Sequence, residues 1–404
     1  MADVQEFSLN KKTKMIATQV FDQTPYLKDS KSYVPEDQMS GKKYGGSYSV
    51  YLPDPGKTRI AKASAGKAGL QAQIDAIQEP EYKIECVAAL NDCEIDEWNK
   101  LNDIESFKNE IIDRRANSVA QNIEKDAVDS TVFRSCQVAY VGELDLNAIG
   151  LGSAGLDNVA VAGKKVTFVN PDTGALLAKK ALGLFNHPEI AQKLYDDKYI
   201  GRYGSTDVVS EIFMPTVVAN SGHTATITLE AVTDSTGTIG FKPVKALASG
   251  TATAGDVFKL AGLKIVDLNG IQTNKDYSVV VGPDGSIPEI RIEIEGKSCG
   301  NANAWMPTGT AAGSKSLTYS LVHGKTYTVI QTRAKGSVAF DTYKFKEMPG
   351  TKMEKARYEG SPIEVQVYEG GNIGDFSSMV RMVVPYAVGL PDPREAVLSY
   401  VEAE

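Results

Sequence analysis

The sequence predicts an α+β fold in which an all-β domain is inserted into a chain of mixed helices and strands. Three observations lead to this prediction: the composition, one long amphipathic helix, and a later segment of short strands. The chain has 404 residues, of which 42% are hydrophobic and 23% are charged, so it can form sizeable hydrophobic cores. At about 150 residues per domain, this length corresponds to two or three domains.

The charge balance argues against a protein that grips nucleic acid tightly. The net charge is −8 and the pI is near 5.2, whereas proteins that bind phosphates usually carry a basic surplus. Loose contact with DNA, or its confinement, remains compatible with this charge. The N-terminal residues lack a secretory signal, and no apolar run approaches the roughly 18 residues that span a membrane. The four cysteines have no metal-ligand or CxxC spacing, which predicts free thiols in a reducing cytoplasm.

The first 80 residues predict two segments with little core of their own. Residues 1–40 are polar with scattered apolar anchors and weak helical periodicity, which fits an arm packed on neighbouring chains and equally a frayed tail. Residues 41–80 contain a strand-like alternation at 47–52, a turn, and then many small residues, which predicts a long hairpin excursion. The candidate residues for contact with another protein chain are Tyr48, Tyr51, Lys57, Arg59, Lys62 and Lys67.

Residues 97–129 contain the clearest element of the sequence. Apolar residues recur at steps of three and four, and charged residues occupy the other face. At 1.5 Å per residue, a helix of about 30 residues is a rod of roughly 45 Å, much longer than the usual 11–12 residues or so. We expect a structural beam with these core residues: Trp98, Leu101, Ile104, Ile111, Ile112, Val119 and Ile123.

The remaining residues predict a mixed region interrupted by a β-rich one. Residues 130–212 contain a strand at 165–169, a helix that begins near Asn170 or Asp172, and another helix at 188–199. Residues 213–300 are rich in Thr, Val and Gly, with short runs between turn clusters, which predicts a β-barrel or sandwich. Residues 301–404 return to the mixed pattern and contain a strongly alternating strand at 379–386.

The sequence contains no convincing catalytic or cofactor-binding motif. His187, His223 and His323 are far apart in sequence and are expected on the surface or in loops, not as metal ligands. The segment Gly150–Gly155 matches GxGxxG, but it lacks the strand and helix context of a dinucleotide site and is expected to be a flexible loop. Phosphate-loop and nucleophile-elbow motifs are absent. We therefore expect no enzyme activity, no cofactor and no metal.

The order of these segments resembles a known family. The stretches that carry the resemblance are 31–35 with 48–53, 82–87 with 95–101, the long helix, 240–244, 255–264, and 381–386 with Pro393-Arg394-Glu395-Ala396-Val397. Together they are similar to the major capsid proteins of tailed phages, which have the Hong Kong-97-type fold. Most similar are the short-tailed Salmonella phage (P-22-like) coat proteins with an inserted β-domain. The resemblance covers roughly residues 28–401.

The resemblance implies a division of the chain and a function. The segments would be an N-terminal arm (1–40), an extended loop (41–80), a peripheral domain with the spine helix (81–130), an axial domain (131–212), the inserted domain (213–300), and the rest of the axial and peripheral domains (301–404). The chain would assemble into hexamers and pentamers of an icosahedral shell in the bacterial cytoplasm and would end in the virion. Its partners would be itself, a scaffolding protein, a portal protein and packaged double-stranded DNA without sequence specificity.

The sequence also departs from the family, and other functions compete. The ending reads Pro-Arg-Glu-Ala, with the first two residues exchanged, the inserted domain is shorter, and no long charged loop follows Phe241-Lys242-Pro243. A tail-tube or decoration protein is an alternative that the β-rich segment allows and the long helix disfavours. An enzyme with an appended β-domain is disfavoured by the missing motifs.

Overall fold

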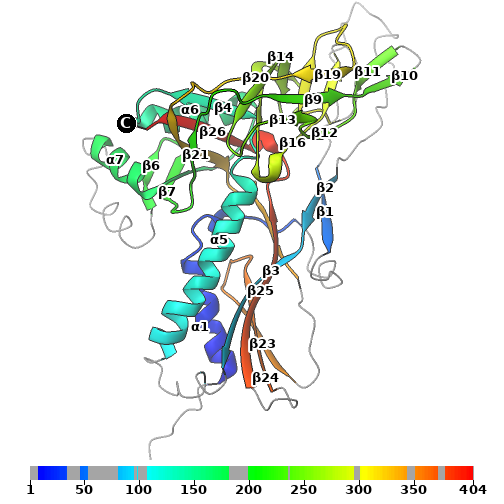
Figure 1. Ribbon diagram of the computed structural model, residues 1–404. Helices are drawn as coiled ribbons and strands as arrows, with labels where there is room; N and C mark the ends of the chain where they lie inside the picture. The colour runs from blue at the N-terminus through cyan, green and yellow to red at the C-terminus, as the bar shows by residue number, and fades with distance from the viewer. Residues whose placement is uncertain are drawn as a thin grey trace, which may run out of the picture.

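The computed structural model describes residues 8–33, 46–52, 81–94, 98, 107–181, 199–234, 237–294, 301–343, 351–371 and 378–403. Within these ranges the chain forms an elongated stalk and a broader upper region (Figure 1). Helices and strands occur in both parts, so the predicted α+β class is confirmed.

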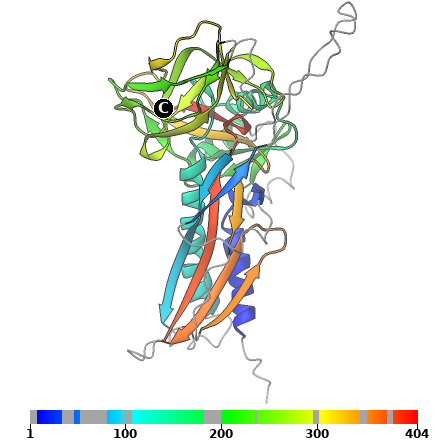
Figure 2. The same cartoon turned by 90° about the vertical axis from the view of Figure 1, so that its right-hand side faces the viewer.

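The stalk is built on a five-stranded antiparallel sheet. Four strands lie in the order β22 (Ala339–Thr342), β25 (Ser378–Gly389), β24 (Glu364–Gly371) and β23 (Lys352–Arg357). The fifth strand, β3 (Val87–Glu94), also pairs with β25. The alternation predicted at 379–386 is the reason why β25 has a buried face, on which Val380, Met382 and Val384 are at most 1% exposed. Figure 2 shows that no described helix covers the opposite face of this sheet.

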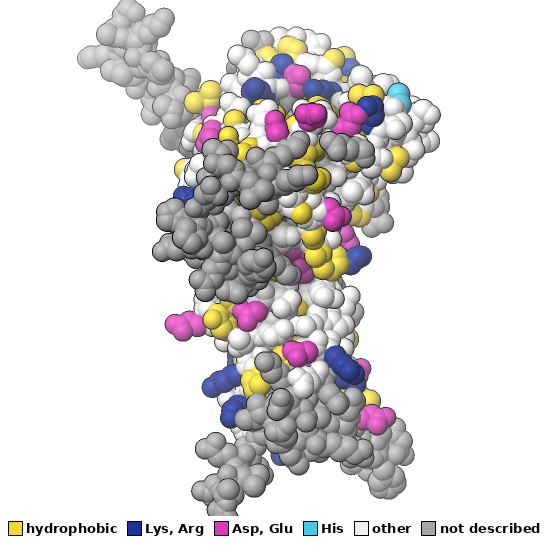
Figure 3. All heavy atoms as spheres, turned by 90° about the vertical axis from the view of Figure 1, so that its left-hand side faces the viewer, with side chains coloured by type: hydrophobic (Ala, Val, Ile, Leu, Met, Phe, Trp, Pro, Cys, Tyr) yellow, Lys and Arg dark blue, Asp and Glu magenta, His cyan; other side chains and the backbone are white. Residues whose placement is uncertain are grey.

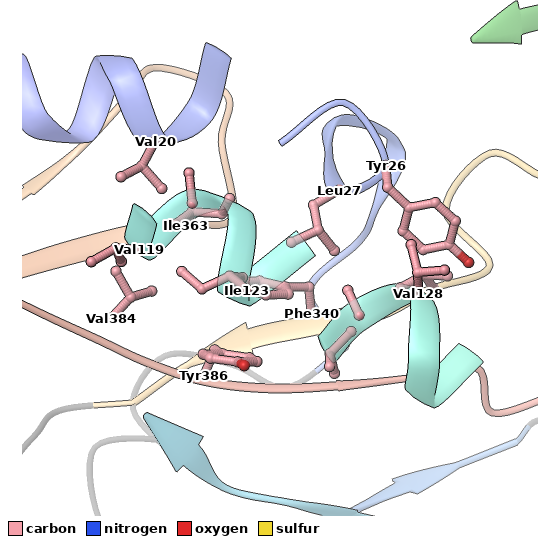
Figure 4. Close-up of a cluster of buried hydrophobic side chains, with 14 of the residues drawn as sticks. Val20, Tyr26, Leu27, Val119, Ile123, Val128, Phe340, Ile363, Val384 and Tyr386 are labelled. Atoms are coloured by element: carbon pink, nitrogen blue, oxygen red, sulfur yellow. The ribbon is translucent and has the colours of Figure 1, made fainter. Parts of the chain in front are cut away.

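The helices of the stalk cover only that buried face. They are α1 (Leu9–Asp22), the π-helical segment η3 (Lys108–Ala116) and α5 (Asn117–Thr131), which continues η3. Figure 4 shows side chains of all these layers in one core, with Val20 from α1, Ile123 from α5 and Val384 from β25 close together. Each of the three is fully buried. Burial of apolar surface between helix and sheet is therefore what holds the stalk together.

A polar network fixes the end of the N-terminal segment to the top of the stalk. After α1, the short helix η1 (Leu27–Asp29) follows the fully buried Tyr26. The Tyr26 hydroxyl lies 2.6 Å from Thr131 Oγ1 and donates to Gln331 Oε1, also at 2.6 Å. The Arg333 guanidinium stacks on the Tyr26 ring, 4.4 Å from its centroid, and burial lowers the pKa of Arg333.

The first sheet of the upper region mixes parallel and antiparallel strands. Its order is β4 (Gln137–Val141), β26 (Ala396–Glu402), β21 (Thr326–Ala334), β5 (Lys165–Val169), β7 (Thr206–Ser210) and β6 (Tyr199–Tyr203), and β8 (Thr216–Val218) also pairs with β21. Helix α6 (Leu146–Asn158) packs on β26 and β21, and α7 (Pro171–Ala181) lies near α6. Asn170 caps α7, since its side chain accepts from the Thr173 amide at 2.7 Å.

The β-rich part of the upper region contains three further sheets with a core of their own. The largest has the order β10 (Ala231–Asp234), β11 (Gly237–Phe241), β17 (Ile292–Ile294), β18 (Ala304–Met306), β14 (Val257–Val266) and β15 (Gln272–Val280), with β20 (Thr318–Tyr319) on β14. The others are β13 (Ser249–Gly250), β9 (Ala225–Leu229) and β19 (Gly313–Ser316), and the pair β12 (Val244–Ala246) and β16 (Ser286–Ile290), which follows the short helix η4 (Pro283–Gly285).

Several sequence expectations need correction. Residues 9–22 of the expected arm or frayed tail form a helix, because Ser8 caps it and its apolar side packs on the stalk. The long helix ends at Thr131 instead of 129, and part of it is π-helical. The β-rich strands run on to Tyr319, past the expected limit of 300, while β8 at 216–218 belongs to the sheet of β21. The expected helix at 188–199 lies outside the described residues except for its end, where Tyr199 begins β6.

The GxGxxG segment is also not the flexible loop that was expected, because it lies within α6. A Cβ atom on Gly152 would lie 2.8 Å from Thr332 Cβ on β21, and one on Gly155 would lie 2.8 Å from Val397 Cγ2 on β26. Real Cβ atoms are essentially never in such close contact. The two glycines therefore allow the helix to approach the sheet closely, which is a packing role.

Candidate functional site

The candidate site is the base of the predicted extended loop, which the structure describes as a two-stranded hairpin. Strand β1 (Ser47–Tyr51) pairs antiparallel with β2 (Glu81–Glu85), and Tyr48 lies opposite Ile84. Because side chains alternate along a strand, Tyr48, Val50 and Ile84 share one face and are at most 3% exposed. Tyr51 is 59% exposed. The hairpin is therefore two-sided, with one face toward the rest of the chain.

A small apolar cluster attaches the buried face of the hairpin to the top of the stalk. The hairpin and the residue after it contribute Tyr48, Val50, Ile84 and Cys86, and the stalk side contributes Ala339, Tyr343 and Ala387. The Tyr343 hydroxyl donates to Val87 O at 2.9 Å, and the Cys86 amide donates to Gly46 O at 2.8 Å. The Arg134 guanidinium stacks 4.6 Å from the centroid of the Tyr82 ring. These contacts place the hairpin beside the stalk sheet (Figure 1).

One buried carboxylate joins the hairpin to two other segments. Asp341, on β22, is 2% exposed. Its Oδ2 accepts from the Tyr48 hydroxyl at 2.6 Å, and its Oδ1 accepts from the Ser32 hydroxyl at 2.5 Å and from the Tyr33 amide at 3.2 Å. Burial, followed by the Asp341 charge, raises the pKa of Tyr48 well above its usual value. The Tyr48 phenol therefore remains a proton donor at physiological pH.

The structure separates the six predicted contact residues into three groups. Tyr48 is 2% exposed and donates to Asp341 of its own chain, and its contact with another chain stays a prediction. Tyr51 is exposed on the outer face of the hairpin, and its role stays a prediction. The basic residues Lys57, Arg59, Lys62 and Lys67 lie outside the described residues.

Five of the seven predicted core residues of the long helix are described and buried: Trp98, Ile111, Ile112, Val119 and Ile123. Leu101 and Ile104 lie outside the described residues. Trp98 Nε1 donates to Glu369 Oε1 at 2.8 Å, and the Lys12 ammonium lies 4.7 Å from the centroid of the indole ring. Burial lowers the pKa of Lys12, against the opposing effect of Glu369.

Two histidines, His223 and His323, pack on the same Tyr319 ring where the chain enters and leaves the β-rich segment, a feature that the sequence did not reveal. His223 Nδ1 lies 2.6 Å from Oδ2 of the fully buried Asp256. The Tyr319 hydroxyl donates to Asp256 Oδ1 at 2.9 Å, and the His323 ring stacks on Tyr319. The two connecting segments also pair directly, since the Ala219 amide donates to Lys325 O at 2.9 Å. His223 and His323 are 100 residues apart. Their proximity can be predicted from the sequence only if both ends of the insertion are known.

A buried ion pair near the C-terminus joins the β-rich segment to the first sheet of the upper region. In the short helix η5 (Pro393–Glu395), Arg394 binds Asp392 through two nitrogens, with Nη2 2.7 Å from Asp392 Oδ2, and its Nη1 donates to Asp267 O at 2.8 Å. Burial opposes ionisation of Asp392, but Arg394 outweighs this effect and holds the pKa of Asp392 below its usual value. Burial and the Asp392 charge raise the pKa of Glu395 to about 7, against the opposing effects of Arg394 and Lys31.

Among the described residues, no group of three His, Cys, Asp or Glu side chains could hold a metal ion. No helix in this part of the chain is long and apolar enough to cross a membrane. The three cysteines that the structure describes, Cys86, Cys93 and Cys136, are buried and form no disulfide bond. On the face shown in Figure 3, acidic and basic side chains are interspersed.

The chain is similar to known proteins in structure but not in sequence. No family model matches the sequence. No curated protein matches it either. Among solved structures, the chain is similar to one from Mycobacterium phage Che8, with 11% identity and a TM-score of 0.38 over 92% of this chain and 89% of that one.

Two further matches are the capsid of cyanophage P-SCSP1u and the mature capsid of bacteriophage PhiM1. The first has 11% identity and a TM-score of 0.39, over 90% of this chain and 85% of that one. The second has 10% identity and a TM-score of 0.36, over 92% and 85%. Identities and TM-scores this low transfer no residue roles.

Proposed function

We propose that the chain is the major capsid protein of a tailed double-stranded DNA bacteriophage. In this proposal it has no catalytic or cofactor-binding role, and it assembles into hexamers and pentamers of an icosahedral shell. The alternative is another self-assembling virion component, such as a tail-tube or decoration protein. The segments keep the boundaries expected from the sequence, except that the inserted β-domain extends from about Ala225 to Tyr319.

The observation that carries this proposal is the one-sided stalk. A sheet that is apolar on one face is normally covered by another layer. Here α1 and α5 cover one face, and part of the other carries exposed apolar side chains, with Leu90 47% and Met379 48% exposed, although Val383 on that face is fully buried. Their strand neighbours Asp92 and Arg381 form a bidentate ion pair on that same face, with Arg381 Nη2 2.8 Å from Asp92 Oδ2. A long, flat element with a mixed apolar and charged face supports lateral packing of many copies.

The partners in this proposal follow from the same role. The chain associates with itself, with a scaffolding protein during assembly, with a portal protein at one vertex, and with packaged DNA without sequence specificity. Interspersed surface charge and a net charge of −8 support confinement of DNA and not tight binding to it. The proposed location is the virion, after assembly in the host bacterial cytoplasm.

Electron microscopy of the purified full chain tests the proposal. The chain is expressed with and without the neighbouring phage genes and is examined in negative stain. Closed, roughly isometric shells, including aberrant ones, are the expected result. Tubes of uniform width would favour a tail protein, and small discrete oligomers under every condition would contradict both readings.

Deletion of residues 54–70 tests the role of the loop beyond the hairpin. We expect a subunit that folds, because the deletion spares both hairpin strands and their contacts with the stalk, but that assembles poorly. A Gly-Ser segment of the same length in place of 54–70 is the matched control that separates loop length from loop side chains. Normal shells from the deletion variant would contradict the assignment of an intersubunit loop.

A further inference from the structure

We infer that Asp341 is a positioning residue that couples the N-terminal segment to hairpin β1–β2 and so sets the direction in which the loop leaves the subunit. The inference rests on the proposed function for its consequence in assembly. The coupling itself is a property of the single chain and can be measured before any assembly.

The geometry gives Asp341 a different partner on each oxygen. Oδ2 holds the hairpin through the Tyr48 hydroxyl, whereas Oδ1 holds the N-terminal segment through the Ser32 hydroxyl and the Tyr33 amide, which also reaches Oδ2 at 3.4 Å. These partners are 293 and about 309 residues away in sequence, so the carboxylate joins two segments that share no local chain connection with it. Hydrogen bonds to a carboxylate are about twice as strong as those between neutral groups, and this carboxylate is 2% exposed.

The backbone around Asp341 makes the coupling rigid. The N-terminal segment is fixed beside β22 because the Phe340 amide donates to Lys31 O at 3.0 Å and the Lys31 amide donates to Val338 O at 2.9 Å. The Tyr33 hydroxyl donates to Gly336 O at 3.0 Å. Movement of residues 31–33 would therefore change the position of one carboxylate oxygen, and through the other oxygen the hairpin would move as well.

The remaining hairpin contacts explain why the loss of this carboxylate should not prevent folding. Val50 and Ile84 stay packed on the apolar cluster, and the β1–β2 ladder does not use Asp341. Apolar packing is non-directional, so it holds the hairpin near the stalk without setting its tilt. The directional constraint comes from hydrogen bonds such as that between Tyr48 and Asp341.

Hydrogen–deuterium exchange on the unassembled full chain tests the coupling. The variants are Asp341→Asn, Tyr48→Phe and Ser32→Ala, and the control is Tyr51→Phe, which removes the same hydroxyl from the exposed face of the same strand. We expect exchange of amides 47–51 and 81–85 to rise about tenfold in the first two variants, and to rise severalfold in Ser32→Ala, which does not touch the hairpin. Exchange in β21 and β26, and throughout the Tyr51→Phe control, should be unchanged.

Three outcomes would overturn the inference: unchanged hairpin exchange in Tyr48→Phe, an equal rise across the whole chain, or no hairpin response to Ser32→Ala. If Asp341→Asn does not fold, Tyr48→Phe and Ser32→Ala decide, because both keep the carboxylate. The double variant Tyr48→Phe with Asp341→Asn should exchange no faster than Asp341→Asn alone. Micrographs of the same variants test the consequence, since we expect fewer closed shells. If the unmodified chain forms no shells, the proposed function is contradicted. The exchange experiment still tests the coupling, because it is measured on the unassembled chain.

Discussion

Replacement of Glu395 by Gln should make the chain more stable at neutral pH and leave its stability unchanged in mild acid. The folded-state pKa of Glu395 is raised from 4.5 to about 7, so the folded chain binds a proton that the unfolded chain has lost between these pH values. Stability therefore falls as the pH rises from 4.5 to 7. At 1.36 kcal/mol for each pH unit, the loss is at most about 3 kcal/mol.

Chemical denaturation of the unassembled chain at several pH values between 5 and 8 measures this effect. Glu395→Gln should unfold at a higher denaturant concentration than the parent at pH 8, and the two curves should converge near pH 5. Glu359→Gln removes one negative charge from an exposed turn and is the matched control. A constant difference between parent and Glu395→Gln over the whole range would refute the reasoning, because a partly buried carboxyl with a raised pKa must produce a pH-dependent difference.

Three further variants test the packing of the folded chain by denaturation of the unassembled protein. Ile111→Asp puts an unpaired charge at a fully buried site and should cost at least about 3 kcal/mol or prevent folding; parent-like melting would contradict the stalk core. Gly152→Ala should cost roughly 1–3 kcal/mol because its Cβ meets Thr332, while Gly150→Ala, with its nearest neighbour at 3.7 Å, should be neutral or stabilise by up to about 1 kcal/mol. Tyr26→Phe removes a hydroxyl with two buried partners and should cost roughly 1–3 kcal/mol; an unchanged midpoint would mean that this network contributes nothing.

The elements with a strong local period could be predicted from the sequence. The long helix and the strand at 379–386 were recognised because each buries one face, and the burial of Ile111 and Val384 confirms both. The helix at 9–22 was missed because polar residues such as the buried Lys12 and Thr13 interrupt its apolar pattern. Their burial depends on the stalk, which no local pattern reveals.

The polar contacts of the candidate site were beyond sequence reasoning for a different reason. Tyr48 was recognised as important, but its orientation toward Asp341 depends on strand register across 293 residues. A shift of one residue would have turned it to solvent. The role of Gly152 was misjudged for a similar reason, since the segment was expected to be a flexible loop, whereas the glycine is needed because Thr332 lies close to it on a distant strand.

The pairing of the two connecting segments of the β-rich region has a consequence for protein engineering. The Gly324 amide donates to Ala219 O at 2.8 Å, and the Ala219 amide donates to Lys325 O, so the insertion begins and ends at neighbouring points. A tight turn between these points could replace the whole segment without stretching β8 or β21. The same geometry makes the site suitable for grafting foreign domains whose termini are adjacent, provided that the groups left uncovered, above all Arg394 and Asp392, are substituted together.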